Sequence, residues 1–118
     1  MSEQVSWQVE LAVKPGKLAA FQALTHRMVE STHAEYGVLV YERYLSADGT
    51  VVYVYERYQD SAAAVAHLRR FSQMYGSEFA DLVERRRFVV FGMPSAELKR
   101  MLEPLGATHF AFFAGFST

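Results

Sequence analysis

The sequence predicts one α+β domain built around an antiparallel sheet, and three patterns carry this prediction. Apolar and polar residues alternate over positions 5–13, as they do in a half-buried strand. Positions 38–46 and 50–58 form a nearly repeated pair of strands around an Asp-Gly turn. Apolar residues recur at helical spacing before and after this pair. With 118 residues and no linker or low-complexity segment, the chain is expected to be a single domain over 1–118.

The first predicted strand and the helix after it are separated by a short breaking segment. The apolar positions of this strand are Val5, Trp7, Val9, Leu11 and Val13. Pro15 and Gly16 end the strand, and an amphipathic helix is expected from Lys17 to about Tyr36. Gly37 would close this helix as the glycine that commonly follows a helix end.

The segment 38–58 gives the clearest local signal in the chain. Residues 38–44 and 52–58 are both rich in β-branched and aromatic residues, and both end in Tyr-Glu-Arg-Tyr. Between them lies Asp48-Gly49, a pair that favours a tight hairpin turn. We therefore expect two antiparallel strands that pair about this turn.

Further helices and strands follow the hairpin. Asp60 is a good N-cap for the next helix. The expected elements are a helix over 61–72, a helical stretch through 75–83, a short strand over 88–93, a helix over 96–102 and a last strand over 107–116. The order β-α-β-β-α-β, with a short helix and an extra strand, is the split βαβ or ferredoxin-like pattern.

Neither face of the predicted hairpin is polar, whereas a half-exposed antiparallel sheet alternates apolar and polar residues. One face carries Leu39, Tyr41, Arg43, Leu45, Val52, Val54, Glu56 and Tyr58; the other carries Val38, Val40, Glu42, Tyr44, Val51, Tyr53, Tyr55 and Arg57. Helices cover only one face of a split βαβ sheet, so the other is expected to meet a second copy in a homodimer. The alternative is ordinary edge-strand composition.

Composition and charge argue against several classes of function. A formal net charge of −1 gives no long-range field for nucleic acid or an anionic membrane. The absence of cysteine excludes disulfides, a thiol nucleophile and thiolate metal sites. The basic run Arg85–Arg87 is expected at a helix end, solvated, with phosphate binding as the alternative. Without a signal-peptide pattern or an apolar run of about 20 residues, the expected location is the cytoplasm, without membrane contact.

A stretch from the hairpin into the next helix is similar to a known family. Glu56, Tyr58 and Asp60 fit its strand-end pattern Glu-x-Tyr/Trp-x-Asp, and Ala63 with His67 fits its helix pattern Ala-x-x-x-His. With the element order, the chain resembles the antibiotic biosynthesis monooxygenase (ABM) domain family. The resemblance implies a dimeric α/β barrel with a ligand pocket between helices and sheet in each subunit. The resemblance also implies the activity of the characterised relatives that oxidise quinols or anthrones with O₂ and neither metal nor flavin, so no cofactor is expected. Other relatives degrade haem, isomerise a phosphate of a signalling molecule or have no assigned activity.

One departure limits what the resemblance implies. The haem-degrading branch of the family uses an Asn-Trp-His set, and an Asn-Trp-Arg set carries anthrone oxidation, whereas this chain contains no Asn. Its only tryptophan, Trp7, is on the first strand, and Tyr occupies the third-strand place where those enzymes have Trp. Haem degradation is therefore not expected, and the anthrone mechanism does not transfer residue by residue.

His67 is the expected catalytic residue. Helical spacing places it on the face of Ala64, Leu68 and Phe71, turned toward the sheet. A neutral imidazole there would accept a proton from a phenol or quinol hydroxyl, and the electron-rich anion would then react with O₂ without a cofactor. The alternative is a structural histidine hydrogen-bonded to a strand residue such as Glu56.

A second set of residues is expected to bind a small hydrophobic or aromatic molecule. These residues are Trp7, Tyr53, Tyr55, Tyr75, Arg43 and Glu56. The aromatic side chains would line a flat pocket, and tyrosine hydroxyls would hold a quinol oxygen. Arg43 and Glu56 would fix a carbonyl group or orient His67. The alternatives are plain core packing and two cross-strand charge pairs, Arg43 with Glu56 and Glu42 with Arg57.

No metal site is predicted. His26 and His33 are separated by about 10 Å along the first helix, too far to share one ion, and His109 is isolated on the last strand. The leading hypothesis is a cofactor-independent monooxygenase acting on a small aromatic quinol or phenol. The alternatives are a non-catalytic module that binds a small ligand, and an isomerase or lyase on the same fold.

Overall fold

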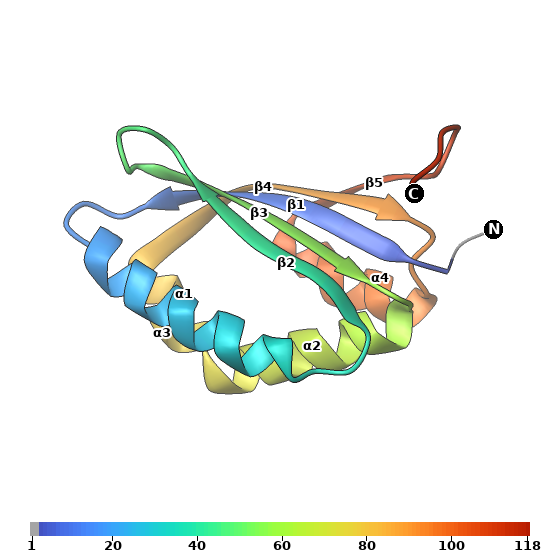
Figure 1. The fold of residues 1–118 in the computed structure, drawn as a ribbon, viewed down its shortest axis with the longest axis horizontal. Helices are drawn as coiled ribbons and strands as arrows, with labels where there is room; N and C mark the ends of the chain where they lie inside the picture. The colour runs from blue at the N-terminus through green and yellow to red at the C-terminus, as the bar shows by residue number, and fades with distance from the viewer. Residues whose placement is uncertain (1–2) are drawn as a thin grey trace.

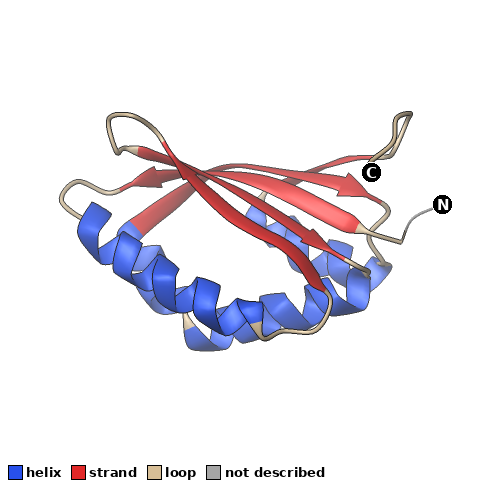
Figure 2. Cartoon of the chain, viewed as in Figure 1, coloured by secondary structure: helices blue, strands red, loops and turns tan. Residues whose placement is uncertain are grey.

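A computed structural model describes residues 3–118 as two layers, a five-stranded sheet with helices packed on one of its faces (Figure 1, Figure 2). In chain order the elements are β1 (Val5–Val13), α1 (Leu18–His33), β2 (Val38–Leu45), β3 (Val51–Tyr58), α2 (Ser61–Met74), α3 (Gly76–Leu82), β4 (Val83–Gly92), α4 (Ala96–Leu102), the 3-10 turn η1 (Glu103–Leu105) and β5 (Ala107–Phe110). The predicted α+β class and ferredoxin-like order are confirmed.

The sheet has the strand order β2-β3-β1-β4-β5, with β1 at its centre. β1 runs antiparallel to both neighbours, β3 and β4, while β5 adds to the outer edge of β4 in parallel. This arrangement makes the first strand the most enclosed one. Its inward side chains Val5, Trp7, Val9 and Leu11 are all buried against the helices.

The hairpin pairs in the register that the sequence predicts. Tyr44 lies opposite Tyr53, so the pairing is symmetric about the Asp-Gly turn. The Asp48 carboxylate closes this turn by accepting hydrogen bonds from the Ser46 hydroxyl at 2.8 Å and the Thr50 amide at 3.0 Å. Since side chains alternate between the faces of a strand, this register decides which residues of the repeat face the helices.

The helix α2 begins where the sequence predicts it. Asp60 caps it by accepting a hydrogen bond from the Ala63 amide at 2.9 Å. The small residues Ala63 and Ala64 are buried against the sheet, so this end of α2 lies close to the strands. His67 follows one turn later on the same buried face, as predicted.

Three predicted boundaries need correction. α1 ends at His33, earlier than Tyr36, so Gly37 is not its closing glycine. The run Arg85–Arg87 lies inside β4 and not at a helix end, because β4 pairs with β1 from Val83 onward. β5 ends at Phe110, where its pairing with β4 stops.

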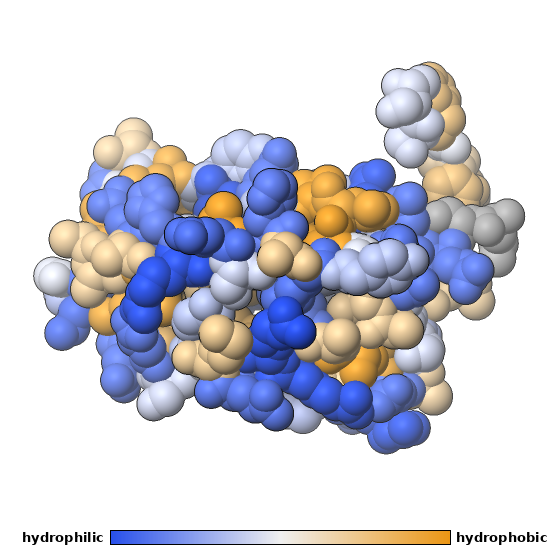
Figure 3. All heavy atoms as spheres, turned by 60° about the horizontal axis from the view of Figure 1, so that its bottom comes forward, coloured by the Kyte–Doolittle hydropathy of each residue, from blue (hydrophilic) through white to orange (hydrophobic). Residues whose placement is uncertain are grey.

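The two faces of the sheet differ in whether helices cover them. Helices pack on one face, and the molecular surface on their side is mainly hydrophilic, with small separate apolar patches (Figure 3). The opposite face carries no helix (Figure 2) and exposes Tyr44, Tyr53 and Phe91 among polar neighbours such as Gln8. Over residues 3–118 there is no helix with the length and apolar character needed to cross a membrane.

The connection between α1 and β2 depends on one glycine. Gly37 has φ +82°, and a Cβ built there would lie 2.6 Å from the Cβ of Ala63. We expect Gly37→Ala to lower the free energy of unfolding by more than about 2 kcal/mol, since backbone strain and a clash with α2 add. Urea unfolding followed by circular dichroism measures this loss.

Gly16→Ala is the matched control, because Gly16 has φ +75° and open space around its Cβ position. In this variant the free energy of unfolding should fall by about 1–2 kcal/mol, the cost of the positive φ for alanine alone. Equal losses in the two variants would contradict a tight contact between Gly37 and α2.

Candidate active site

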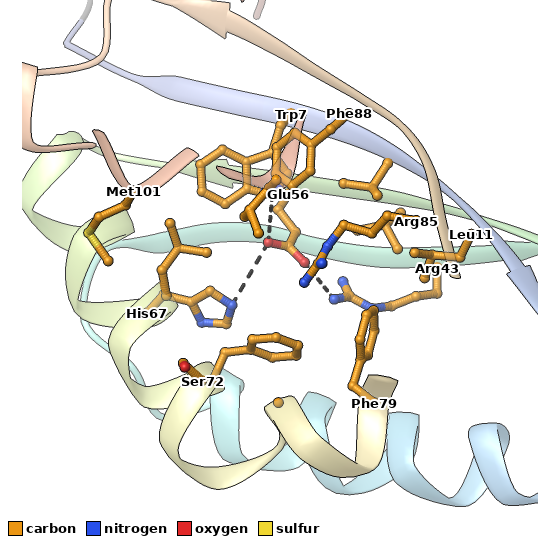
Figure 4. A pocket seen from close by; sticks show the side chains of 16 residues that line it. Trp7, Leu11, Arg43, Glu56, His67, Ser72, Phe79, Arg85, Phe88 and Met101 are labelled. Carbon is orange, nitrogen blue, oxygen red and sulfur yellow. Dashed lines mark hydrogen bonds and ion pairs between the residues drawn. The ribbon is translucent and has the colours of Figure 1, made fainter. Parts of the chain in front are cut away.

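A pocket of about 330 Å³ lies between the sheet and the helices α2 and α3. Its apolar walls include Leu11, Val54, Phe71, Phe79, Phe88 and Met101. Four ionisable side chains also line it, and Figure 4 shows them around one cavity: Arg43, Glu56, His67 and Arg85. A mostly apolar cavity with a few convergent polar groups is the usual form of a small-molecule site.

Glu56 is the polar centre of this pocket, and its residue is only 5% exposed. Its Oε1 accepts hydrogen bonds from Trp7 Nε1 at 2.9 Å and from the Tyr58 hydroxyl at 2.5 Å. Its Oε2 accepts one from Arg43 Nη2 at 2.5 Å. The donors come from β1, β3 and β2, so the register of three strands builds the shell around this carboxylate.

The surroundings keep Glu56 ionised. Burial alone would raise its pKa, but the positive charge of Arg43 and the hydrogen bonds from Tyr58 and Arg43 outweigh burial. The pKa of Glu56 therefore lies below its ordinary value. The opposite holds for Tyr58, whose pKa is raised well above the ordinary value by burial and by the adjacent Glu56 charge. Tyr58 thus stays a hydrogen-bond donor to Glu56.

His67 lies between two carboxylates, and its two ring nitrogens have different surroundings. Nδ1 is 3.0 Å from Glu35 Oε1, while Nε2 is 3.8 Å from Glu56 Oε1, beyond hydrogen-bonding distance. A neutral imidazole held in this way carries its proton on Nδ1 and donates it to Glu35. Nε2, on the pocket side, is then the basic nitrogen.

Arg43 is fixed by two contacts of different kinds. Its Nη2 donates to Glu56, and its guanidinium carbon lies 3.4 Å from the centroid of the Tyr41 ring. The Nε and Nη1 atoms of the same guanidinium are buried without a hydrogen-bond acceptor among residues 3–118. The protein thus leaves two donors of this guanidinium unused, and both atoms are buried.

The structure separates the predicted site residues into two groups. Trp7, Arg43, Glu56 and His67 line one pocket. Tyr53 and Tyr55 do not, and their placement there was wrong: Tyr53 donates to Glu10 on the opposite face of the sheet, and Tyr55 accepts from Arg57. The reason is strand alternation, which sends positions 53 and 55 away from 54 and 56.

The structure also places Tyr75 and the two predicted cross-strand charge pairs differently from one another. Tyr75 packs against the core beside the pocket without lining it. The Arg43–Glu56 charge pair is present and lies in the pocket, so it is more than an exposed cross-strand pair. On the other face Arg57 donates to Tyr55 and Glu42 accepts from Tyr44, so these two charged residues have other partners.

Sequence reasoning missed two residues of this site, Glu35 and Arg85. Glu35 follows the end of α1, where no periodic pattern marks an inward side chain, and only the fold brings it to His67 on α2. Arg85 was assigned to a solvated helix end, and the pairing of β4 with β1 places it in the pocket. Within residues 3–118 no group of three or more His, Asp or Glu side chains is arranged to hold a metal ion.

Glu56 makes stability depend on pH in a definite direction. Its pKa is lowered in the folded state, so its contribution is present above its ordinary pKa of about 4.3 and is lost as pH falls through the folded value. We expect Glu56→Gln to lower the free energy of unfolding at pH 7 by about 3 kcal/mol, because Arg43 stays buried without its anion. Urea unfolding at pH 7 and at about pH 3 should show that wild type and Glu56→Gln differ less in free energy of unfolding at the lower pH.

Glu97→Gln is the control, since Glu97 pairs with Arg69 where both side chains are half exposed. This variant should change the free energy of unfolding by less than about 1 kcal/mol at either pH. A difference between wild type and Glu56→Gln that does not narrow in acid would contradict the ionised state of Glu56.

Comparisons with known proteins bear on the fold and on the family. Among solved structures, MupZ from Pseudomonas fluorescens is 26% identical with a TM-score of 0.84, over 100% of this chain and 91% of that one. Rv0793 from Mycobacterium tuberculosis is 27% identical with a TM-score of 0.67, over 79% of this chain and 98% of that one. SnoaB, a cofactor-independent oxygenase from Streptomyces nogalater, is 13% identical with a TM-score of 0.68, over 80% and 97% of the two chains, and shows the fold alone.

A search of curated proteins gave no sequence match. The sequence model of one protein family, described as antibiotic biosynthesis monooxygenase, matches residues 5–85, from β1 through α3 into β4. This span includes every strand that donates to Glu56 and the helix that carries His67. The chain therefore belongs to the antibiotic biosynthesis monooxygenase family.

Proposed function

We propose that this protein is a cofactor-independent monooxygenase that oxidises a small aromatic quinol or phenol with O₂. The observation that carries the proposal is His67, whose Nδ1 is anchored by Glu35 and whose side chain lines the apolar pocket. Membership of the monooxygenase family supports it further. The 330 Å³ pocket with aromatic walls suits a flat ring.

The first step of the proposed reaction is proton transfer. His67 Nε2 takes the proton of a substrate hydroxyl, and Glu35 stabilises the imidazolium that forms. The positive charge of Arg43, which lines the pocket, then stabilises the phenolate oxygen. Glu56 is a poor base by comparison, because its two oxygens already accept three hydrogen bonds and its pKa is lowered.

The second step is oxidation of the electron-rich anion by O₂. One oxygen atom enters the ring and the other leaves as water, so a quinol and O₂ give a hydroxyquinone and H₂O. The substrate supplies all four electrons, and no external reductant is needed. The proton that His67 accepted returns to the departing oxygen. In this scheme the protein contributes deprotonation, charge stabilisation and an apolar site, and it needs no redox group.

We also propose that the protein functions as a homodimer that covers the helix-free face of the sheet. That face exposes Tyr44, Tyr53, Phe91 and Phe110, each at least 37% exposed. Charged and polar groups lie beside them, with Glu10 bonded to Tyr53. Such a mixture of aromatic and polar groups is typical of protein interfaces.

A proton-transferring isomerase or lyase is the second candidate. The imidazole of His67 anchored by Glu35, beside the positive charge of Arg43, supports it, because proton transfer needs a base and a stabilised anion but no O₂. Activity under anaerobic conditions would support this candidate and exclude obligatory use of O₂. Saturable binding without turnover in either atmosphere would instead support a binding module.

Oxygen uptake tests the proposed function directly. Metal-free protein should consume O₂ with at least one member of a panel of hydroquinones, naphthalenediols and anthrones. His67→Gln should lower kcat/KM by about 100-fold or more, because the amide keeps a donor for Glu35 but accepts no proton. Glu35→Gln should lower it by about tenfold or more, since it weakens the anchoring of the imidazole.

His26→Gln is the matched control, because His26 is exposed on α1 away from the pocket. This variant should retain wild-type uptake. No uptake above buffer across the whole panel would count against the monooxygenase assignment. Unchanged uptake in His67→Gln would show that His67 is not the base.

Light scattering at micromolar concentration tests the homodimer, with a mass of twice the chain expected. Tyr53→Arg places a charge on the helix-free face and should shift the protein toward monomer. Met74→Arg alters an exposed residue on the helix side and should leave the mass unchanged. A monomeric wild type would contradict the proposed cover of this face.

A further inference from the structure

A break in the pairing of β4 with β1 turns Arg85 toward the pocket. Glu10 pairs with Arg87, but the next residue of β1, Leu11, pairs with Arg85, so Arg86 is an extra residue in β4. Such a bulge reverses the alternation of side chains along the strand. Arg85 therefore lies on the same face as the buried Phe88, where unbroken alternation would have placed Arg86. Figure 4 shows Arg85 extending into the pocket beside Arg43.

Arg85 has no acidic partner among residues 3–118. Its neighbour Arg86 pairs with Glu84 at 3.0 Å, whereas no Asp or Glu forms an ion pair with Arg85. Its guanidinium carbon lies 5.4 Å from the centroid of the Phe79 ring on α3. Partial burial lowers the pKa of Arg85, yet an arginine remains charged at neutral pH. The positive charge at this point therefore has no protein anion beside it, although the residue as a whole is exposed to solvent.

The arginine and glutamate charges that line the pocket sum to one positive unit. Arg43 and Arg85 contribute two positive charges and Glu56 contributes one negative charge. Behind His67, Glu35 has Arg70 at 3.9 Å, and these two charges offset each other. An apolar cavity with one excess positive charge is matched by a ligand that carries a single negative charge.

We propose that the ligand of this pocket is an aromatic acid, whose carboxylate pairs with Arg85 while its ring occupies the apolar cavity. The inference rests on the proposed function in using the same pocket as the substrate site. The carboxylate would lie at the Arg85 end, and the reacting hydroxyl would lie near His67 and Arg43. Arginine suits this role, because its planar group presents paired donors to a carboxylate.

Calorimetric titration with 2-naphthoate and 2-naphthamide tests this inference without any reaction. The two probes share ring and size and differ in charge. Wild-type protein should bind the acid about tenfold or more tightly, the difference that a charge-assisted hydrogen bond makes. Arg85→Gln should reduce this preference to less than about threefold, while Arg85→Lys should keep part of it.

Arg86→Gln is the matched control, since Arg86 is the adjacent arginine of the bulge but pairs with Glu84. It should keep the full preference for the acid. If Arg85→Gln does not fold, Arg85→Met replaces it, because methionine keeps an unbranched stem against Phe79. An equal affinity of wild type for the two probes would overturn the inference. A preference for the acid that persists in Arg85→Gln or Arg85→Met would also overturn the inference. The same holds if neither probe binds to wild type at millimolar concentration.

Oxygen uptake separates failure of this inference from failure of the proposed function. The substrates are 1,4-dihydroxy-2-naphthoate and its neutral parent 1,4-dihydroxynaphthalene. Turnover of both with equal kcat/KM would overturn the acid inference and leave the monooxygenase intact. Preferential binding of naphthoate without uptake of O₂ with either diol would leave the acid inference intact and count against the monooxygenase.

Discussion

The buried carboxylate of Glu56 is the interaction on which the rest of the site depends. An isolated ionised carboxylate in an apolar interior is strongly destabilised, so its donors have to be in place for the sheet and helices to close over it. Trp7, Arg43 and Tyr58 supply three hydrogen bonds from three strands. A shift of one residue in β1 or β2 would turn a donor to the other face. The strand register of the folded sheet is therefore also the register that gives the Glu56 carboxylate its three hydrogen bonds.

The state of the Glu56 carboxylate also determines which side chain of the pocket can act as a base. Because Glu56 is ionised and its oxygens are occupied, it holds Arg43 in place and is a poor proton acceptor. His67 is anchored from the opposite side by Glu35, so its second nitrogen remains available to a ligand. One carboxylate thus positions the cation and the other positions the base. Two carboxylates of similar type act differently because their surroundings differ.

Much of the fold could be predicted because local patterns and packing agree. The alternation of residues 5–13, the Asp-Gly turn and the cap at Asp60 each fix an element without help from distant parts of the chain. Helical periodicity also gave the inward orientation of His67. Tyr53 and Tyr55 show the limit of composition: they share the strand of Glu56 but alternate to its opposite face.

Glu35 and Arg85 could not be predicted for a different reason. Glu35 reaches His67 only because α1 and α2 pack on the same face of the sheet, which no local pattern encodes. Arg85 points inward only because one extra residue in β4 reverses the alternation, and a run of three arginines does not show which of them is the extra one. Both positions follow from contacts between segments that are distant in the sequence, helix packing for Glu35 and strand pairing for Arg85.

The protonation pattern of His67 tests the central claim most directly. Long-range ¹H–¹⁵N NMR of ¹⁵N-histidine-labelled protein at neutral pH distinguishes the two ring nitrogens of each histidine. We predict that His67 carries a single proton, on Nδ1, with Nε2 unprotonated and available to the pocket. A proton on Nε2 at that pH, with Nδ1 bare or protonated as well, would contradict the assignment of His67 as the base of this site.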